Sequence, residues 1–199
     1  TGLPDKIETH SWGDYDNDGD MDIFFKSNSY VHIFDNNGKG QFSVLKKFDE
    51  AVQGGSLDFV DYNNDNQLDI VVTGALLNQS VHSIFYKNQC SKTNTIPTPP
   101  LILRDSMHLD TVYVSWEKGS DKESIENELY YNFYLYKVNG DTLLNSMSDH
   151  KTGQLRKPTL GNTQNSMDWK IKLDSAGIYK WAVQAIDYGF EGSKFSVEK

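Results

Sequence analysis

The chain has 199 residues, of which 37% are hydrophobic and 24% charged, and its net charge is −9 at pH 7. This length and composition are those of one or two globular domains and not of a disordered chain. An acidic chain without clustered Lys and Arg lacks the charge that nucleic-acid phosphates require, so we expect no nucleic-acid partner. No apolar run reaches the roughly 18 residues of a membrane span, so we expect none.

Cys90 is the single cysteine of the chain. A disulfide framework within the chain is therefore excluded, and we expect the fold to depend on its hydrophobic core and on bound metal. Such cysteine usage is compatible with a secreted bacterial protein. The chain begins with Thr1 and not with Met, which predicts a trimmed N-terminus.

An internal repeat dominates the first half of the chain. Residues 12–24 read WGDYDNDGDMDIF, and residues 59–71 read FVDYNNDNQLDIV, so the two segments align without a gap at a period of 47 residues. Alternating or continuous apolar residues at 30–34 and 81–87 predict a strand after each segment. Residues 34–45 carry Asn-Gly and Lys-Gly turn signals between apolar runs, which predicts a hairpin. Each repeat is therefore expected to be strand, acidic loop, strand, strand, with a fourth strand in the first repeat.

The acidic loops have the composition of calcium sites. In the first loop a tight turn can direct Asp14, Asp16 and Asp18 toward one centre, and Gly19 permits the left-handed turn that adds the carbonyl of Asp20 and the carboxylate of Asp22. The second loop offers Asp61, Asn63, Asp65 and Asp69 with the carbonyl of Gln67, and Asn66 replaces the glycine. Oxygen-only ligands, several of them charged, suit Ca²⁺, and the absence of His and Cys from both loops disfavours zinc and copper.

The loops have two other possible interpretations. An EF-hand requires a Glu at loop position 12 and helices on both sides, whereas these positions are Phe25 and Val72 and the flanking residues favour strands. A solvated acidic turn without metal stays open as the alternative. A metal-free turn explains a single acidic loop more readily than it explains two loops that align without a gap.

At these residues the chain resembles the FG-GAP (VCBS-type) repeats of integrin-α-like β-propellers. The resemblance covers roughly residues 8–88 and implies two neighbouring propeller blades, each with a calcium loop between its first two strands. Closed propellers need at least about four blades. The resemblance therefore implies either further blades before Thr1 or an open pair of repeats packed on the second domain.

A change of pattern marks the domain boundary. Residues 91–100 carry three prolines in their last four positions, which predicts an extended linker between a domain over 1–90 and a second domain over 101–199. The second domain shows seven strand-like segments, which favour a β-sandwich. They lie at residues 101–105, 111–117, 129–138, 142–146, 166–173, 178–186 and 193–198. Residues 121–131 were the only candidate for a turn of helix.

The second domain resembles a fibronectin type III-like sandwich. This resemblance implies that Trp116 packs in the core, that Tyr179 makes a corner hydrogen bond, and that Val183 and Ala185 point inward. Core packing is the favoured interpretation of the aromatic residues of this domain. An aromatic platform that stacks on sugars stays open for Tyr131, Tyr134, Tyr136 and Tyr188.

The sequence contains no catalytic constellation that we recognise, since no His, Ser or Gly-rich segment has the context of a triad or a phosphate loop. We therefore predict a calcium-binding, non-catalytic adhesion or binding module of a larger extracellular or cell-surface protein, with an unidentified protein or glycan ligand. Two alternatives remain open. The chain could supply accessory domains of a secreted polysaccharide- or protein-degrading enzyme, or it could be a spacer that binds only calcium.

Overall fold

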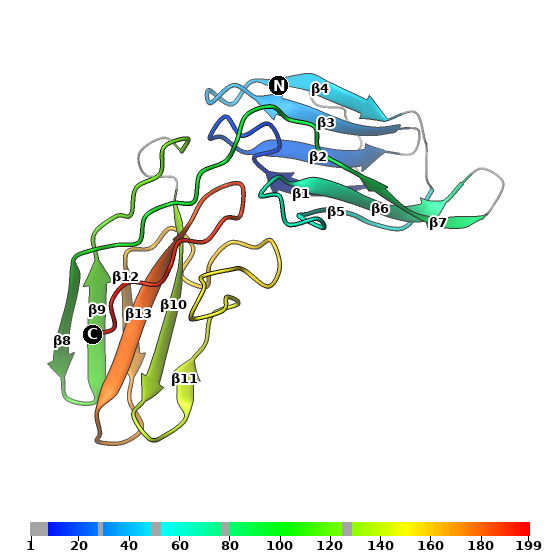
Figure 1. The fold of residues 1–199 in the computed structure, drawn as a ribbon. Helices are drawn as coiled ribbons and strands as arrows, with labels where there is room; N and C mark the ends of the chain where they lie inside the picture. Colours follow the sequence, from blue (N-terminus) through cyan, green and yellow to red (C-terminus); the bar gives the residue numbers. More distant parts are fainter. Residues whose placement is uncertain (1–7, 28–29, 49–52, 77–79, 125–128) are drawn as a thin grey trace. The chain divides into compact units, whose positions relative to one another are not determined.

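The computed structural model describes residues 8–27, 30–48, 53–76, 80–124 and 129–199, and these residues form thirteen β-strands and no helix (Figure 1). The predicted all-β class is confirmed. No helix in the described ranges has the length and apolar character needed to span a bilayer. The candidate turn of helix at 121–131 is not helical where it is described, because residues 122–124 form bends and Tyr130 begins a strand, while residues 125–128 lie outside the described residues. The chain divides into two compact units, Thr1–Asn94 and Thr95–Lys199, and each is described by itself.

The first unit contains two antiparallel sheets, one for each repeat. The first sheet has the order β1-β2-β3-β4, with β1 at Thr9–Gly13, β2 at Asp22–Ser27, β3 at Tyr30–Asn36 and β4 at Phe42–Phe48. The second has the order β5-β6-β7, with β5 at Leu57–Val60, β6 at Asp69–Ala75 and β7 at Val81–Tyr86. The predicted order of strand, loop, strand, strand is present in both repeats. The fourth strand occurs, among the described residues, only in the first repeat.

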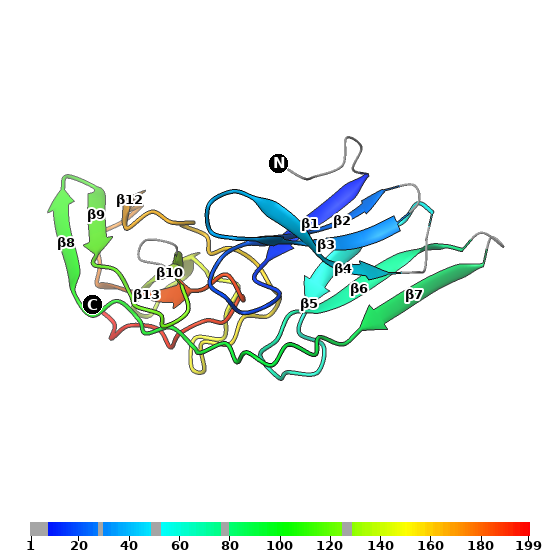
Figure 2. The same cartoon turned by 90° about the horizontal axis from the view of Figure 1, so that it is seen from above.

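Aromatic side chains join the two sheets, which lie one over the other in both views (Figures 1 and 2). Phe24 and Phe59 are buried and their ring centroids are 5.5 Å apart, while those of Phe48 and Tyr86 are 4.5 Å apart. Tyr15, from the first acidic loop, stacks on Phe59 at 6.1 Å. Burial of these rings fixes the positions of the strand ends that carry the loops.

The second unit is a sandwich of two three-stranded antiparallel sheets. One sheet has the order β12-β9-β8, with β8 at Leu103–His108, β9 at Thr111–Trp116 and β12 at Asp168–Lys172. The other has the order β11-β10-β13, with β10 at Tyr130–Lys137, β11 at Thr142–Leu144 and β13 at Tyr179–Ile186. Both sheets contribute to one core, in which Trp116 of β9 packs with Phe133 of β10 and Trp181 of β13.

The predicted strand over 193–198 is wrong. This segment runs antiparallel beside β13, because Ser193 and Ser196 donate their amides to the carbonyls of Ala185 and Val183. The amides of Ala185 and Val183, however, donate to the hydroxyl oxygens of the same two serines. Side-chain oxygens thus accept bonds that a regular ladder gives to carbonyls, and the segment forms no strand.

The expectations for four residues of the second unit are met. Trp116, Val183 and Ala185 are buried in the core of the second unit. Tyr179, the first residue of β13, donates from its hydroxyl to the carbonyl of Ser175 at 2.6 Å, which is the predicted corner hydrogen bond.

The idea of a sugar-stacking platform fails for part of its residue set. Tyr131 and Tyr134 are buried, because β10 directs Tyr131 into the core and His150 and Phe195 cover Tyr134 on the other face. Tyr136 and Tyr188 are half-buried. A flat platform made of all four rings is therefore absent.

The proline-rich segment is not a free spacer along its whole length. The amide of Thr98 donates to the carbonyl of Ser120 at 2.7 Å, and the hydroxyl of Thr95 donates to Glu123 Oε2 at 2.5 Å. Both contacts lie within the second unit, whereas residues up to Asn94 belong to the first. These polar groups find partners in the sandwich, so the second half of the expected linker is part of the second unit.

Candidate metal centres

The first acidic loop joins the antiparallel strands β1 and β2 and is shaped by its own first aspartate. Asp14 Oδ1 accepts the amide of Asp18 at 3.0 Å, and Asp14 Oδ2 accepts the amide of Gly19 at 2.9 Å. Asn17 and Gly19 have φ values of 54° and 94°, so the turn uses two left-handed residues. Gly19 fulfils the prediction of a left-handed turn, and both residue types tolerate this conformation.

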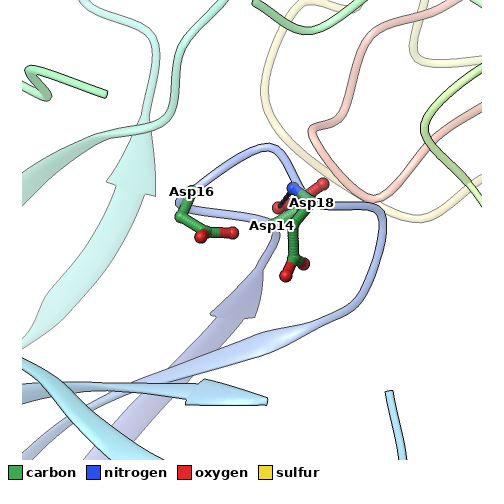
Figure 3. Close-up of side chains that lie close together, drawn as sticks. All are labelled: Asp14, Asp16 and Asp18. Carbon is green, nitrogen blue, oxygen red and sulfur yellow. Dashed lines mark hydrogen bonds between the residues drawn. The ribbon is translucent and has the colours of Figure 1, made fainter. Parts of the chain in front are cut away.

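This turn brings three carboxylates together. One oxygen from each of Asp14, Asp16 and Asp18 lies within 4.8 Å of the other two. Figure 3 shows the three side chains on the loop, with the carboxylate of Asp16 directed toward the other two. Asp22 lies at the start of β2, fully buried, and accepts the amides of Tyr15 and Asn36 at 2.9 and 3.0 Å. Asp20, 8% exposed, has a side-chain oxygen that is buried and without a hydrogen-bond partner.

The second loop, between β5 and β6, repeats this geometry. Asp61 accepts the amides of Asp65 and Asn66 at 3.2 and 3.1 Å, as Asp14 does 47 positions earlier. Asn64 and Asn66 have φ values of 58° and 62°, at the positions of Asn17 and Gly19. The predicted left-handed conformation of Asn66 is confirmed. Carboxylate oxygens of Asp61, Asp65 and Asp69 lie within 4.8 Å of one another.

The remaining predicted residues of the second loop differ from those of the first. Asn63 donates from Nδ2 to Asp69 Oδ2 at 3.1 Å, so a neutral amide stands beside the carboxylate group where the first loop has Asp16. Gln67 donates from Nε2 to the carbonyl of Cys90 at 3.1 Å, so its side chain is engaged outside the loop. The predicted role of Gln67 concerns its backbone carbonyl and stays a prediction.

Two asparagines that the sequence analysis missed orient the last aspartate of each loop. The amide of Asn36, at the end of β3, donates to Asp22 Oδ1, and its side chain donates to the carbonyl of Met21 at 3.2 Å. In the same way the amide of Asn88, just after β7, donates to Asp69 Oδ1 at 2.7 Å, and its side chain donates to the carbonyl of Leu68 at 3.1 Å. The signal in the sequence is an aromatic residue two positions before each asparagine, Phe34 and Tyr86.

The acidic groups of the first loop are held in an environment that disfavours their negative charge. Burial raises the pKa of Asp14 to about 7, against the opposing effect of the amides of Gly19 and Asp18. Burial likewise raises the pKa of Asp22 to about 8. Burial and then repulsion from Asp18 and Asp14 raise the pKa of Asp20 to about 7. Without a cation, this packing of carboxylates is electrostatically unfavourable.

Asp35, an acid outside the loop, also repels the loop carboxylates. Burial raises the pKa of Asp35, in β3, and repulsion from Asp16 raises it further. Asp35 in turn contributes to the raised pKa values of Asp18 and Asp20. In the second loop, burial raises the pKa of Asp69 and the charges of Asp65 and Asp61 add to the shift. The environment of the second loop therefore also disfavours negative charge and favours a bound cation.

Each loop also has one lysine at its rim. Lys92 Nζ lies 3.0 Å from Asp16 Oδ2 and 3.9 Å from Asp18 Oδ2, and Lys87 Nζ lies 3.1 Å from Asp65 Oδ2. Both lysine side chains are about half exposed, so these ion pairs are screened by water. Neither lysine reaches the buried aspartates Asp14 and Asp22 with an ion pair in the described structure.

Orphaned oxygen atoms show that the loops fit a hard cation. Buried side-chain oxygens usually have a hydrogen-bond partner. In the described residues, however, several buried oxygens in the loops have none, namely Asp16 Oδ1, Asn17 Oδ1 and Asp20 Oδ1 in the first loop and Asn63 Oδ1 in the second. Oxygen acceptors without donors, among carboxylates that repel each other, are the donor set that Ca²⁺ prefers.

The fold and these loops define an all-β protein with two copies of an acidic loop, each between adjacent strands and each with carboxylates that could hold a metal ion. Residues 9–72 match the FG-GAP-like repeat family, and this range contains both loops. FG-GAP-like repeats are typical of extracellular or surface proteins. No curated protein matches the chain.

Proposed function

We propose that this protein is a calcium-binding, non-catalytic module of extracellular or cell-surface type that binds a protein or glycan. The observation that carries the calcium proposal is the duplicated loop geometry. In both repeats the first aspartate accepts two amides of its own loop, and three carboxylates converge within 4.8 Å. A solvated acidic turn gives no reason for the same hydrogen bonds, left-handed residues and buried oxygens to occur twice.

Ca²⁺ would supply positive charge and oxygen coordination in each loop. The candidate ligands of the first ion are Asp14, Asp16, Asp18, Asp20 and Asp22, and those of the second are Asp61, Asn63, Asp65, Gln67 and Asp69. The role that we propose for calcium is structural, because binding to the folded state alone stabilises that state. The proposed metal thus holds the ends of β2 and β6 in place.

The second unit is proposed to be a fibronectin type III-like spacer or adhesion module. Its sheet orders, β12-β9-β8 and β11-β10-β13, and the corner hydrogen bond of Tyr179 support this interpretation. The absence of enzymatic activity is likewise a proposal, based on the lack of a catalytic constellation in the sequence. The exposed Trp12 and Tyr113, which are 39% and 46% exposed, are available for a ligand.

Calorimetric titration of the full 199-residue chain, freed of metal, with CaCl₂ tests the proposal. We expect two calcium ions per chain, and slower amide hydrogen exchange at 14–22 and 61–69 with little change across 103–186. Asp174→Ala, an exposed acid outside both loops, is the control that leaves binding intact. An absence of heat and of exchange protection at millimolar calcium would refute the proposal.

A further inference from the structure

A single buried side chain, that of Asn88, contacts both acidic loops. Its Nδ2 donates to the carbonyl of Leu68 in the second loop at 3.1 Å and to the carbonyl of Tyr15 in the first loop at 2.7 Å. Its backbone amide donates to Asp69 Oδ1 at 2.7 Å, and its Oδ1 accepts the amide of Cys90 at 2.9 Å. Asn88 is 2% exposed, so these bonds form away from competing water.

The residues after Asn88 extend this connection. Cys90 donates from Sγ to the carbonyl of Asp16 in the first loop, and its own carbonyl accepts Gln67 Nε2 of the second. Lys92 pairs with Asp16, and its carbonyl accepts Asn17 Nδ2 at 3.0 Å. Segment 88–92 therefore holds residues of both loops at once, although the loops are 47 positions apart in the sequence.

The equivalent asparagine of the first repeat makes no such bridge. Asn36 donates to Asp22 and Met21 of its own loop, and its Oδ1 is buried without a hydrogen-bond partner in the described structure. The two asparagines thus share the function of orienting an aspartate. Contact with the other loop is the property that distinguishes Asn88, so Asn36 serves as a matched control.

We infer that Asn88 is a positioning residue for both metal centres and couples them, so that occupation of one loop raises the affinity of the other. The inference rests on the proposed binding of calcium. The physical reason is that Tyr15 and Leu68, whose carbonyls accept the bonds from Asn88, are each adjacent in the sequence to candidate ligands. When a cation fixes Asp69 and Leu68, the shared amide of Asn88 also fixes Tyr15, and the second ion then meets a loop that is already ordered.

The coupling is measured first with Asn88 in place. Asp65→Ala disables the second site and Asp18→Ala the first, and each single-site protein is titrated with CaCl₂ by calorimetry beside the wild type. We expect the second ion to bind the wild type about tenfold more tightly than the corresponding single-site protein binds its ion, a factor within the usual range of coupling between sites. This arm needs no Asn88 variant and decides the inference even where such a variant folds poorly.

Asn88→Ala and Asn36→Ala then assign the coupling to a side chain. Asn88→Ala is expected to remove the tenfold factor, whereas Asn36→Ala is expected to weaken the first site and keep the factor. A second readout uses Asp18→Ala protein. There, calcium at the second loop is expected to slow amide exchange at residues 15–18, and the additional change Asn88→Ala is expected to abolish that effect.

The outcomes separate the two proposals. If the wild type binds no calcium, the proposed function fails and the inference fails with it. If both loops bind with the affinities of the single-site proteins, or if Asn36→Ala removes the coupling as fully as Asn88→Ala does, the inference is overturned while the proposed function stands.

Discussion

The ammonium group of Lys92 lies 3.0 Å from Asp16 Oδ2, 76 positions earlier in the chain, and acts as a cation that the chain itself supplies to the first acidic loop. It lies 3.9 Å from Asp18 as well. Calcium would have to compete with this charge for the same two carboxylates. The proposed metal affinity of the first loop is therefore set partly by a residue far from the loop.

Lys92→Ala is predicted to increase the calcium affinity of the first loop. Removal of the ammonium leaves more carboxylate repulsion for the metal to relieve. An exposed ion pair contributes about 0.2–1 kcal/mol, which corresponds to an increase in calcium affinity of roughly 1.5- to 5-fold. Calorimetric titration measures the change. Lys87→Ala, which removes the ion pair with Asp65, is the matched variant and should act directly on the second loop. A weaker first site in Lys92→Ala would contradict the competition.

The first loop is predicted to fill at lower calcium than the second. It supplies carboxylates from Asp14, Asp16, Asp18 and Asp22, whereas the second replaces one of them by the neutral Asn63. A larger number of anionic ligands increases the attraction for the cation. Asp20 is a further acid of the first loop, and burial and repulsion from Asp18 raise its pKa.

Titration of Asp18→Ala and Asp65→Ala tests this order. Asp18→Ala should remove the tighter binding event and should destabilise the first unit more than Asp65→Ala does. If Asp65→Ala removes the tighter event, charge count does not rank the sites, and the rigidity of the loops decides instead.

The stability of the metal-free protein is predicted to fall as pH rises from about 4 to about 8. The pKa of Asp14 is raised from 3.8 to about 7 and that of Asp22 from 3.8 to about 8, so the folded state binds more protons than the unfolded state in this range. The free energy of unfolding then decreases with rising pH. Below pH 3.8 both states are protonated at these groups and this contribution to the slope vanishes.

Thermal unfolding of the chelated protein between pH 4 and pH 8 measures this slope. Asp14→Asn, which cannot ionise, should flatten it. Saturating calcium should restore the stability that is lost above pH 7, because the metal replaces the protons on the same carboxylates. A metal-free protein whose Tm rises steadily across the range would show that these aspartates do not control the pH dependence.

Tyr179→Phe is predicted to destabilise the second unit by about 1 kcal/mol, since it removes one hydrogen bond to a backbone carbonyl. That bond joins the hydroxyl to the carbonyl of Ser175 at 2.6 Å. Differential scanning calorimetry measures the effect. Tyr113→Phe, at an exposed position of β9, is the control with little expected effect. Neither change should alter the calcium titration, and a shift in calcium affinity would show that the second unit influences the loops.

Much of each acidic loop could be predicted from the sequence because its geometry is local. Asp14 and Gly19, or Asp61 and Asn66, lie within one turn of chain, and a short loop with a left-handed residue brings their polar groups together. The gapless repeat at 47 residues and the strand alternation gave the all-β class and the number of strands in each repeat. The hydrogen bond of Tyr179, whose partner is four residues away, was expected only from the resemblance to a fibronectin type III-like sandwich.

The partners of the loops were decided by the tertiary structure alone. Asn88 reaches Tyr15 across 73 positions, and Lys92 reaches Asp16 across 76, because strand pairing returns segment 88–92 to the loops. The strand expected at 193–198 failed for a related reason, since the hydroxyls of Ser193 and Ser196 accept amides of β13 only once the sandwich has formed. Composition and spacing record which ligands a short loop can offer, whereas long-range hydrogen bonds depend on which segments packing brings side by side.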